Sequence, residues 1–328
     1  MSFLQQIARA LSNFVGALSG RNHRETMERL EALEGHCETI VERVAKMDAR
    51  LSETVDAKTR KLRVRVDRIQ RDVRALLRQR VLERSELEHP HSLQMRRFGL
   101  MSQNEEDGII FALAEQAGTV NRTFVEIGCG VNGGNCGFLA NELGWGGLMV
   151  DADEERVRRA KAKFGRRVQC ISAMVTRENV NDLIRDAGLE GEIDLLSIDI
   201  DGNDYWVWDA IEACYPRIVV IEYNALFGAD RALIVPYAPD FDRHSGNASI
   251  YYGASLAALT QLGESKGYRL VVTESEGVNA FFLRNDLAPE IPTMTAEDMF
   301  RARYKPIRRG VDLFAHIREH DLPVIDLN

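Results

Sequence analysis

The stretch Phe124-Val-Glu-Ile-Gly-Cys-Gly-Val-Asn-Gly-Gly-Asn135 decides how the rest of this chain is interpreted. A short apolar run leads into a glycine cluster, and a helical pattern follows over residues 136–143. Glycines let the backbone turn tightly and let a ligand approach it closely. Asp151 follows at the next predicted strand end, where an acid can hold the hydroxyls of a ribose. Three glycines have the GxGxxG spacing of dinucleotide-binding turns: Gly128, Gly130 and Gly133. A purely structural glycine turn is the alternative.

One carboxylate favours a cationic ligand at this turn. Glu126 stands two residues before the first glycine of the cluster, where its negative charge would repel a pyrophosphate. The same charge can accept hydrogen bonds from an ammonium group or from its waters. S-adenosylmethionine carries an amino group and a sulfonium and no phosphate, whereas NAD carries a diphosphate. The charge therefore favours S-adenosylmethionine over NAD.

Outward from this turn, strand patterns alternate with helical patterns. The helical patterns include residues 136–143 and 154–164. Such alternation predicts a parallel sheet with helices on both faces. The short Thr273–Gly277 turn makes the last pair of strands antiparallel. Strands are expected at about 123–127, 147–151, 167–171, 193–199, 217–222, 268–273 and 278–283.

The chain before Pro90 differs in composition from the part that follows. All eight prolines lie at or after this position, and the only aromatic residues before it are Phe3 and Phe14. Apolar residues recur three and four positions apart and predict a coiled coil over 21–89 that joins copies into a homo-oligomer. A helix that folds back on its own domain is the alternative. The repeat slips once and then resumes: Leu30, Leu33, Cys37, Ile40, Val44, Met47 and Leu51, then Val55 and Thr59, then Leu62, Val66, Ile69, Val73 and Leu76.

Residues 1–20 form a separate amphipathic helix in this prediction. An apolar stripe of this kind suits either packing within the oligomer or peripheral contact with a membrane. Membrane-surface helices usually carry several basic residues on the polar face, and only Arg9 is available here, so packing is favoured. The stripe consists of Phe3, Leu4, Ile7, Leu11, Phe14, Val15 and Leu18.

The composition of the chain indicates which partners and which cellular compartment to expect. The formal net charge of -8 argues against nucleic acid as the main partner, because phosphate binding favours a basic surface. Five cysteines without a CxxC pair indicate free thiols in a reducing compartment. No secretory signal and no membrane-spanning run is recognised, so a cytoplasmic protein is expected.

Several motifs make the chain resemble the class I S-adenosylmethionine-dependent methyltransferases, and among them the FkbM-like group. Beside the E-x-G-x-G turn, Gly144-Trp-Gly-Gly-Leu-Met-Val-Asp151 resembles the second-strand segment of that group. Leu196-Ser-Ile-Asp-Ile-Asp-Gly202 resembles its fourth-strand motif, in which Ser197 replaces a usual lysine. Ser102-Gln-Asn-Glu-Glu-Asp107 looks like the helix that leads into the domain. The resemblance covers roughly residues 100–285.

The resemblance completes the expected organisation of the chain. It implies an α/β fold with a Rossmann-like, seven-stranded methyltransferase sheet, mostly parallel with an antiparallel last strand. A long helical coiled coil precedes this domain. The expected divisions are residues 1–20, the coiled coil 21–89, the methyltransferase domain 90–289 and a C-terminal extension 290–328, whose role stays open.

The resemblance also implies the residues that bind the methyl donor. Asp151 would take the ribose hydroxyls, and Asp199 would lie near the methyl group. The turn would cradle the methionine and ribose end through Glu126, Gly128 and Gly130. The adenine pocket would be lined by Ser172, Ala173 and Met174.

Methyl transfer to an oxygen requires a base or a metal, because neutral alcohols are poor nucleophiles. Asp199 and Glu222 end neighbouring strands, and acids at these positions bind magnesium in a similar group of sugar O-methyltransferases. We therefore expect these two residues as Mg²⁺ ligands, and Asp199 and Asp201 as catalytic residues. In the alternative interpretation, Asp204 caps the following helix, and Asp201 with Gly202 only makes the turn.

The long loop 225–250 supplies further candidates. A loop of this length in a compact domain is often a lid over a substrate. His244 lies in it, and the unperturbed pKa of a histidine side chain suits a general base, although a solvated loop histidine is the plainer interpretation. Four aromatic residues would either stack on a sugar ring or fill the core: Trp206, Trp208, Tyr251 and Tyr252.

The expected function is an O-methyltransferase for a hydroxyl of a sugar, a glycan or a related small molecule. The acceptor class rests on the resemblance alone. A coiled-coil scaffold with a non-catalytic Rossmann-like domain is the second hypothesis. An NAD-dependent oxidoreductase is the third, and the charge of Glu126 disfavours it.

Overall fold

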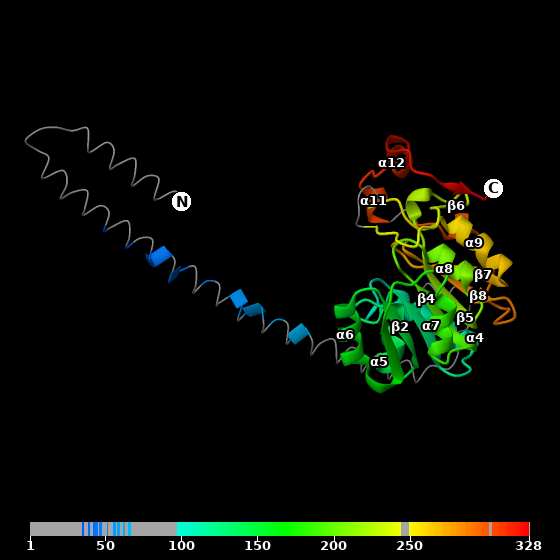
Figure 1. The fold of residues 1–328 in the computed structure, drawn as a ribbon, viewed down its shortest axis with the longest axis horizontal. Helices are drawn as coiled ribbons and strands as arrows, with labels where there is room; N and C mark the ends of the chain where they lie inside the picture. The colour runs from blue at the N-terminus through cyan, green and yellow to red at the C-terminus, as the bar shows by residue number, and fades with distance from the viewer. Residues whose placement is uncertain are drawn as a thin grey trace, which may run out of the picture. The chain divides into compact units, whose positions relative to one another are not determined.

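The computed structural model describes residues 97–243, 249–301 and 304–327, together with single positions between 35 and 66. The chain divides into two units, Met1–Ala75 and Leu76–Asn328. The described positions of the first unit are all helical (Figure 1). Several of them are apolar and about half exposed or more: Val44, Met47, Leu51, Val55, Leu62 and Val66. A partner helix for this stripe stays a prediction, and residues 1–20 lie outside the described part of the chain.

The second unit is built on a seven-stranded sheet with the order β3-β2-β1-β4-β5-β8-β7. The first five strands pair in parallel, and β8 runs antiparallel to both β5 and β7. The mostly parallel seven-stranded sheet expected from the sequence is thus confirmed. The strands are β1 Thr123–Ile127, β2 Gly146–Asp151, β3 Val168–Ser172, β4 Gly191–Ile198, β5 Cys214–Glu222, β7 Tyr268–Thr273 and β8 Asn279–Arg284.

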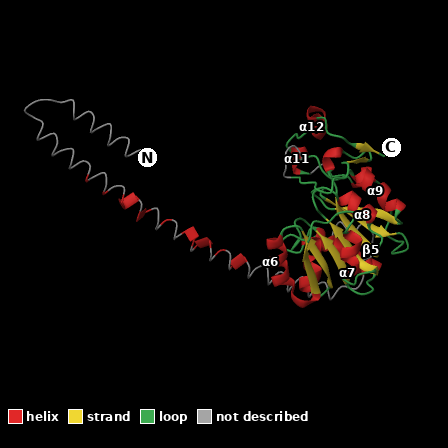
Figure 2. Ribbon diagram, in the orientation of Figure 1, coloured by secondary structure: helices red, strands yellow, loops and turns green. Residues whose placement is uncertain are grey.

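Helices cover both faces of this sheet (Figure 2). Apolar residues of α4, α5 and α6 pack in one hydrophobic cluster, and those of α7, α8 and α9 pack in another. The central strands are buried on both faces and therefore consist of nearly continuous apolar runs. The helices are α4 Glu106–Ala117, α5 Gly137–Glu142, α6 Glu154–Phe164, α7 Val180–Asp186, α8 Asp204–Ala210 and α9 Leu256–Ser265.

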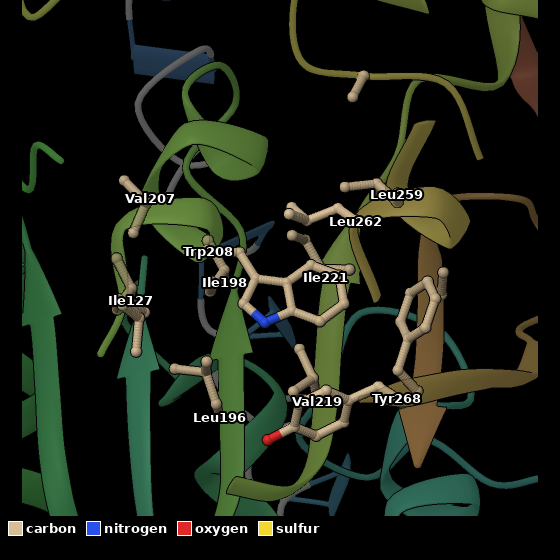
Figure 3. Packing of buried hydrophobic residues seen from close by; sticks show 14 of the residues in the cluster. Ile127, Leu196, Ile198, Val207, Trp208, Val219, Ile221, Leu259, Leu262 and Tyr268 are labelled. Carbon is tan, nitrogen blue, oxygen red and sulfur yellow. The ribbon is translucent and has the colours of Figure 1, made fainter. Parts of the chain in front are cut away.

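Trp208 belongs to the core and not to a ligand site. Its side chain is buried in the same cluster as Ile198 and Ile221 (Figure 3). Its ring centroid lies 5.0 Å from that of Phe282 and 6.0 Å from that of Tyr268. Of the two alternatives for this residue, packing in the core is confirmed.

The C-terminal residues pack on the loop that follows β5. The two-residue strand β9 Ile325–Asp326 pairs antiparallel with β6 Leu233–Ile234. The hydroxyl of Tyr251 donates to the carbonyl of Pro323. A third hydrophobic cluster joins this loop to α11 Lys305–Arg308 and α12 Leu313–His320. The helix α10 Ala296–Met299 packs instead in the cluster that holds α7, α8 and α9. Among the described residues, no helix has the length and apolar character that a membrane crossing requires.

Candidate active site

A pocket of about 270 Å³ lies at the carboxyl ends of the parallel strands, and its lining includes residues that follow β1, β2, β3 and β4. Ligands of open α/β sheets bind at this edge. Two arginines line the pocket, Arg156 and Arg243. Five carboxylates also line it: Asp151, Asp153, Asp199, Asp201 and Asp242. Acidic side chains therefore outnumber basic ones around the cavity.

Gly128 brings the turn after β1 against the end of β4. A Cβ atom on Gly128 would lie 1.8 Å from the carbonyl oxygen of Asp199, and the glycine has φ +94°. No side chain fits there, so this glycine is required by close contact as well as by backbone conformation. Gly130 also has a positive φ, +53°, but a Cβ there would meet open space.

Glu126 lies behind this turn and does not line the pocket. Its side chain is fully buried. Its Oε2 accepts from the backbone N–H of Cys136 at 2.8 Å, and its Oε1 accepts from the Ser197 hydroxyl at 3.1 Å. Burial raises the pKa of Glu126 to about 7. Glu126 thus holds the turn. In this orientation its side chain does not line the pocket in which direct contact with the cofactor was expected.

The contact between Glu126 and Cys136 bears on the choice of ligand. The short helix η1 Gly134–Cys136 leads directly into α5. In dinucleotide-binding folds the pyrophosphate lies at the corresponding helix N-terminus, where free backbone N–H groups point at it. Here the carboxylate of the protein already accepts from an N–H group at this point. This geometry counts against the NAD hypothesis.

Ser197 belongs to the same buried group. Its hydroxyl donates to Glu126 and accepts from the side-chain amide of Asn135 at 3.1 Å. The three side chains are all buried. A small hydroxyl fits here because it bridges a carboxyl and an amide, whereas the lysine usual in the resembled motif would bring a long cationic chain into this space.

Asp151 ends β2 and lines the pocket, and its role as a ribose ligand stays a prediction. Its Oδ2 accepts from the backbone N–H of Gly130 at 2.8 Å, and its Oδ1 accepts from that of Asp153 at 3.0 Å. Its side chain is almost wholly buried, with Arg156 at 3.9 Å. The backbone therefore fixes the carboxylate against the pocket wall.

Of the three residues predicted for the adenine side, two line the pocket. Ala173 and Met174 follow β3 and form part of the wall, and Met174 is 56% exposed. Ser172 is exposed and lies outside the lining. Ser172 is the last residue of β3, whereas Ala173 and Met174 belong to the irregular segment after the strand, which is where the pocket wall begins.

Three carboxylates meet where β4 and β5 end: Asp199, Asp201 and Glu222. Their oxygens lie within 4.8 Å of one another, and we call this group the acidic cluster. Asp201 has a left-handed backbone, φ +57°, which is uncommon for a residue other than glycine. The sequence predicted this meeting of Asp199 and Glu222 from their places at adjacent strand ends.

Asp204 is the first residue of α8 and holds the turn before this helix, so the alternative in which it caps the helix is wrong. Its carboxylate accepts from the backbone N–H groups of Ile200 and Gly202, each at 2.9 Å. These bonds hold the turn that carries Asp201. Burial raises the pKa of Asp204 to about 6.

The acidic cluster is electrostatically strained. Burial raises the pKa of both Asp199 and Glu222, and repulsion from neighbouring carboxylates raises it further. Glu222 is 5% exposed, and its Oε2 has no hydrogen-bond partner among the described residues. A buried acceptor without a partner is costly, so this oxygen is suited to bind a cation or a hydrogen-bond donor.

Arg243 reaches the acidic cluster from the loop after β5. Its Nη1 pairs with Asp201 and lies 3.8 Å from Oε1 of Glu222. Its guanidinium lies over the ring of Tyr252, 3.9 Å from the ring centre. Sequence reasoning missed this arginine, because nothing in the local pattern of the loop shows which side chain turns inward. His244, the predicted base, lies outside the described residues.

The segment 235–243 crosses the edge of the pocket and is fixed at several points. The indole N–H of Trp206 donates to the carbonyl of Val235 at 2.9 Å, and the Asn203 amide donates to that of Ala238 at 2.7 Å. Phe241 packs against Gly202, where a Cβ would lie 2.3 Å from the ring. Trp206 therefore anchors the loop.

Comparisons with known proteins give structural neighbours only. No protein-family model matches the chain, and a search of curated proteins finds no match. Among solved structures, a TehB-like SAM-dependent methyltransferase from Corynebacterium glutamicum is 15% identical with a TM-score of 0.30, over 53% of this chain and 85% of that one. An O-methyltransferase from Bacillus cereus in complex with SAH is 16% identical with a TM-score of 0.35, over 63% and 88%. A SAM-dependent methyltransferase from Aquifex aeolicus is 11% identical with a TM-score of 0.31, over 60% and 97%. At these identities and TM-scores the likeness decides nothing about the reaction of this chain.

Proposed function

We propose that the chain is an S-adenosylmethionine-dependent O-methyltransferase that acts on a hydroxyl of a sugar, a glycan or a related small molecule. The charge of the pocket is the observation that carries this proposal, since five carboxylates and two arginines line it. A cationic sulfonium and an ammonium group gain from such surroundings, whereas a diphosphate is repelled. The acceptor class rests on the resemblance to FkbM-like enzymes.

The residues present suit the methyl donor. Asp151 would accept from the ribose hydroxyls, and Ala173 and Met174 would flank the adenine. Gly128 has no side chain that would block approach to the turn. When bound, S-adenosylmethionine supplies a methyl group on a sulfonium, which is a good leaving group.

The part of this chain in the reaction is to align an acceptor and to take up a proton. Alignment of the acceptor oxygen behind the methyl carbon supplies much of the rate in a displacement of this kind. Asp199 lines the pocket, and burial and the neighbouring carboxylates raise its pKa, so it holds a proton more tightly than an ordinary aspartate. We assign to it the acceptance of the hydroxyl proton, with Asp201 beside it.

The acidic cluster also suits a divalent cation. Its carboxylate oxygens lie close together, and Oε2 of Glu222 lacks a partner. Magnesium prefers oxygen ligands of this type. Asp199 and Glu222 would hold such an ion together with Asp201. The ion would lower the pKa of a bound hydroxyl.

The scaffold hypothesis explains less of the site. Buried carboxylates without partners cost stability, and a domain that only binds a partner protein gains nothing from them. Such groups are retained where function requires them. The unpartnered oxygen of Glu222 is therefore better explained by a catalytic site than by a non-catalytic domain.

Calorimetry with S-adenosylmethionine, S-adenosylhomocysteine and NAD tests the proposal. The first two compounds should bind and NAD should not. Asp151→Ala should weaken the binding of S-adenosylhomocysteine by about a hundredfold, because two ribose hydrogen bonds are lost. Asp153→Ala is the matched control: Asp153 lines the same pocket but caps α6, so affinity should stay within about threefold. Binding of NAD without binding of S-adenosylhomocysteine would refute the proposed function.

We also propose that the exposed apolar stripe of the first unit joins copies of the chain. Met47 and Leu51 are 69% and 64% exposed, and a helix gains stability when such a stripe is covered. Met47→Glu with Leu51→Glu in the full chain should reduce the mass measured by light scattering. Lys46→Glu, at the exposed polar position directly before Met47, should leave that mass unchanged. Equal masses for all three proteins would contradict the proposal.

A further inference from the structure

Arg243 occupies the place at which a cation would neutralise the acidic cluster. Its Nη1 contacts Asp201 and lies 3.8 Å from Glu222, two of the three residues whose oxygens converge. The ring of Tyr252 lies against its guanidinium, 3.9 Å from ring centre to the central carbon. The backbone carbonyl of Ser249 accepts from its Nε at 3.3 Å. The arginine side chain is thus held over the cluster by several contacts.

The guanidinium satisfies the cluster only in part. Oε2 of Glu222 still lacks a hydrogen-bond partner among the described residues, and the Glu222 side chain is only 6% exposed. Three carboxylates face one arginine, so negative charge remains in excess. This residual acceptor is an observation independent of the clustering itself, and it points to a ligand with more positive charge than the arginine provides.

A divalent ion held by all three carboxylates would lie beside the guanidinium, because one of these carboxylates, Asp201, pairs with Arg243. Magnesium lies about 2.1 Å from each carboxylate oxygen that it binds. An arginine nitrogen that bonds to the same oxygens would then lie close to the ion, with two positive charges facing one another in a partly buried site. The attraction that holds Arg243 at Asp201 becomes repulsion once the ion is bound.

We propose that the Arg243 guanidinium and a divalent cation are alternative occupants of the acidic cluster, so that cation binding expels Arg243 from Asp201. This inference rests on the metal site proposed above. Arg243 ends the segment 235–243, whose Phe241, Asp242 and Arg243 line the pocket. Cation binding therefore releases one fixed end of the segment that borders the donor pocket.

The first test measures Mn²⁺ binding by electron paramagnetic resonance, with the full chain and without methyl donor. Arg243→Gln should bind Mn²⁺ about tenfold more tightly than wild type, because no internal cation competes. Arg231→Gln is the matched control. Arg231 lies in the same loop as Arg243 and forms an exposed ion pair with Asp326, so this variant loses the same charge away from the acidic cluster. Its affinity for Mn²⁺ should match that of wild type. Glu222→Gln should abolish binding.

The outcomes of this test are decisive in either direction. Equal affinities of wild type and Arg243→Gln overturn the competition, and so does equal tightening in Arg231→Gln. Absence of Mn²⁺ binding to Arg243→Gln overturns the metal site. The donor proposal is tested separately, because binding of S-adenosylhomocysteine in the calorimetric experiment needs no metal.

A second test uses the wild-type chain and requires no variant to fold. Trypsin cleaves after an arginine only when that side chain can enter the protease, so Arg243 paired with Asp201 should resist cleavage. Saturating Mg²⁺ should accelerate cleavage after Arg243 by about fivefold, measured by mass spectrometry. Cleavage after Arg231 serves as the internal reference and should not change. An unchanged or slower cleavage after Arg243 overturns the proposal.

Discussion

Two groups of buried acids lie on opposite sides of the turn after β1, and they differ in how they are satisfied. Behind the turn, Glu126 accepts from a backbone N–H and from the Ser197 hydroxyl. In front of it, Glu222 keeps an oxygen without a partner, and Asp199 lies beside it. A saturated carboxyl fixes the backbone, whereas an unsaturated one remains available to a ligand. Glu126 therefore supports the structure of the site, whereas Glu222 and Asp199 are available for its chemistry.

Gly128 joins these two regions, and changing it should have the largest effect. Gly128→Ala should lower the free energy of unfolding by about 4 kcal/mol, because a methyl group would overlap the Asp199 carbonyl at a positive φ. Gly130→Ala should lower the free energy of unfolding by only about 1 kcal/mol, since its added methyl group meets open space and only the positive φ is unfavourable. Urea denaturation measures both. Equal losses would show that the two regions are not in contact.

The pH dependence of stability isolates the region behind the turn. The pKa of Glu126 is about 7 in the folded chain, compared with the ordinary value of 4.5 that applies to the unfolded chain. The folded state therefore holds this proton more tightly, and its contribution to stability is lost as the pH rises from 4.5 to about 7. Over that window the wild type should lose about 3 kcal/mol relative to Glu126→Gln.

Urea denaturation of wild type and Glu126→Gln at several pH values measures this difference. Other buried acids, such as Asp204, contribute equally to both proteins and cancel in the comparison. A difference that stays constant with pH would show that Glu126 does not titrate in this range.

The region in front of the turn should distinguish charged from neutral ligands. S-adenosylmethionine carries a sulfonium that S-adenosylhomocysteine lacks, and Asp199 lies at the pocket. Asp199→Asn should weaken the first compound about tenfold more than the second, which corresponds to about 1.4 kcal/mol. Calorimetry measures the ratio, with Asp153→Asn as a control in which it stays near one. Equal weakening of both compounds would place Asp199 away from the sulfonium.

The sequence predicted the sheet well, because buried parallel strands are continuous apolar runs bounded by turn residues. The ends of β1, β2, β4 and β5 follow from these runs, and they bring Asp151, Asp199 and Glu222 to one edge. These positions depend only on chain direction, which the alternation of strands and helices fixes.

Side-chain direction was harder to predict than position. Glu126 shares a face of β1 with Phe124, and alternation along the strand would have shown that it points toward the α4 and α5 side. Arg243 had no such signal, since an irregular loop has no period. The pairing of β6 with β9 was also missed, because two-residue strands far apart in sequence leave no pattern.

The pairing of β6 with β9 sets an order of events during synthesis. The β6 strand and Arg243 leave the ribosome long before β9, so the nascent chain can assemble its central sheet while this loop still lacks its partner strand. The β6 strand, which precedes the pocket-lining residues Phe241, Asp242 and Arg243, can consequently pair with β9 only after residues 325 and 326 have been synthesised.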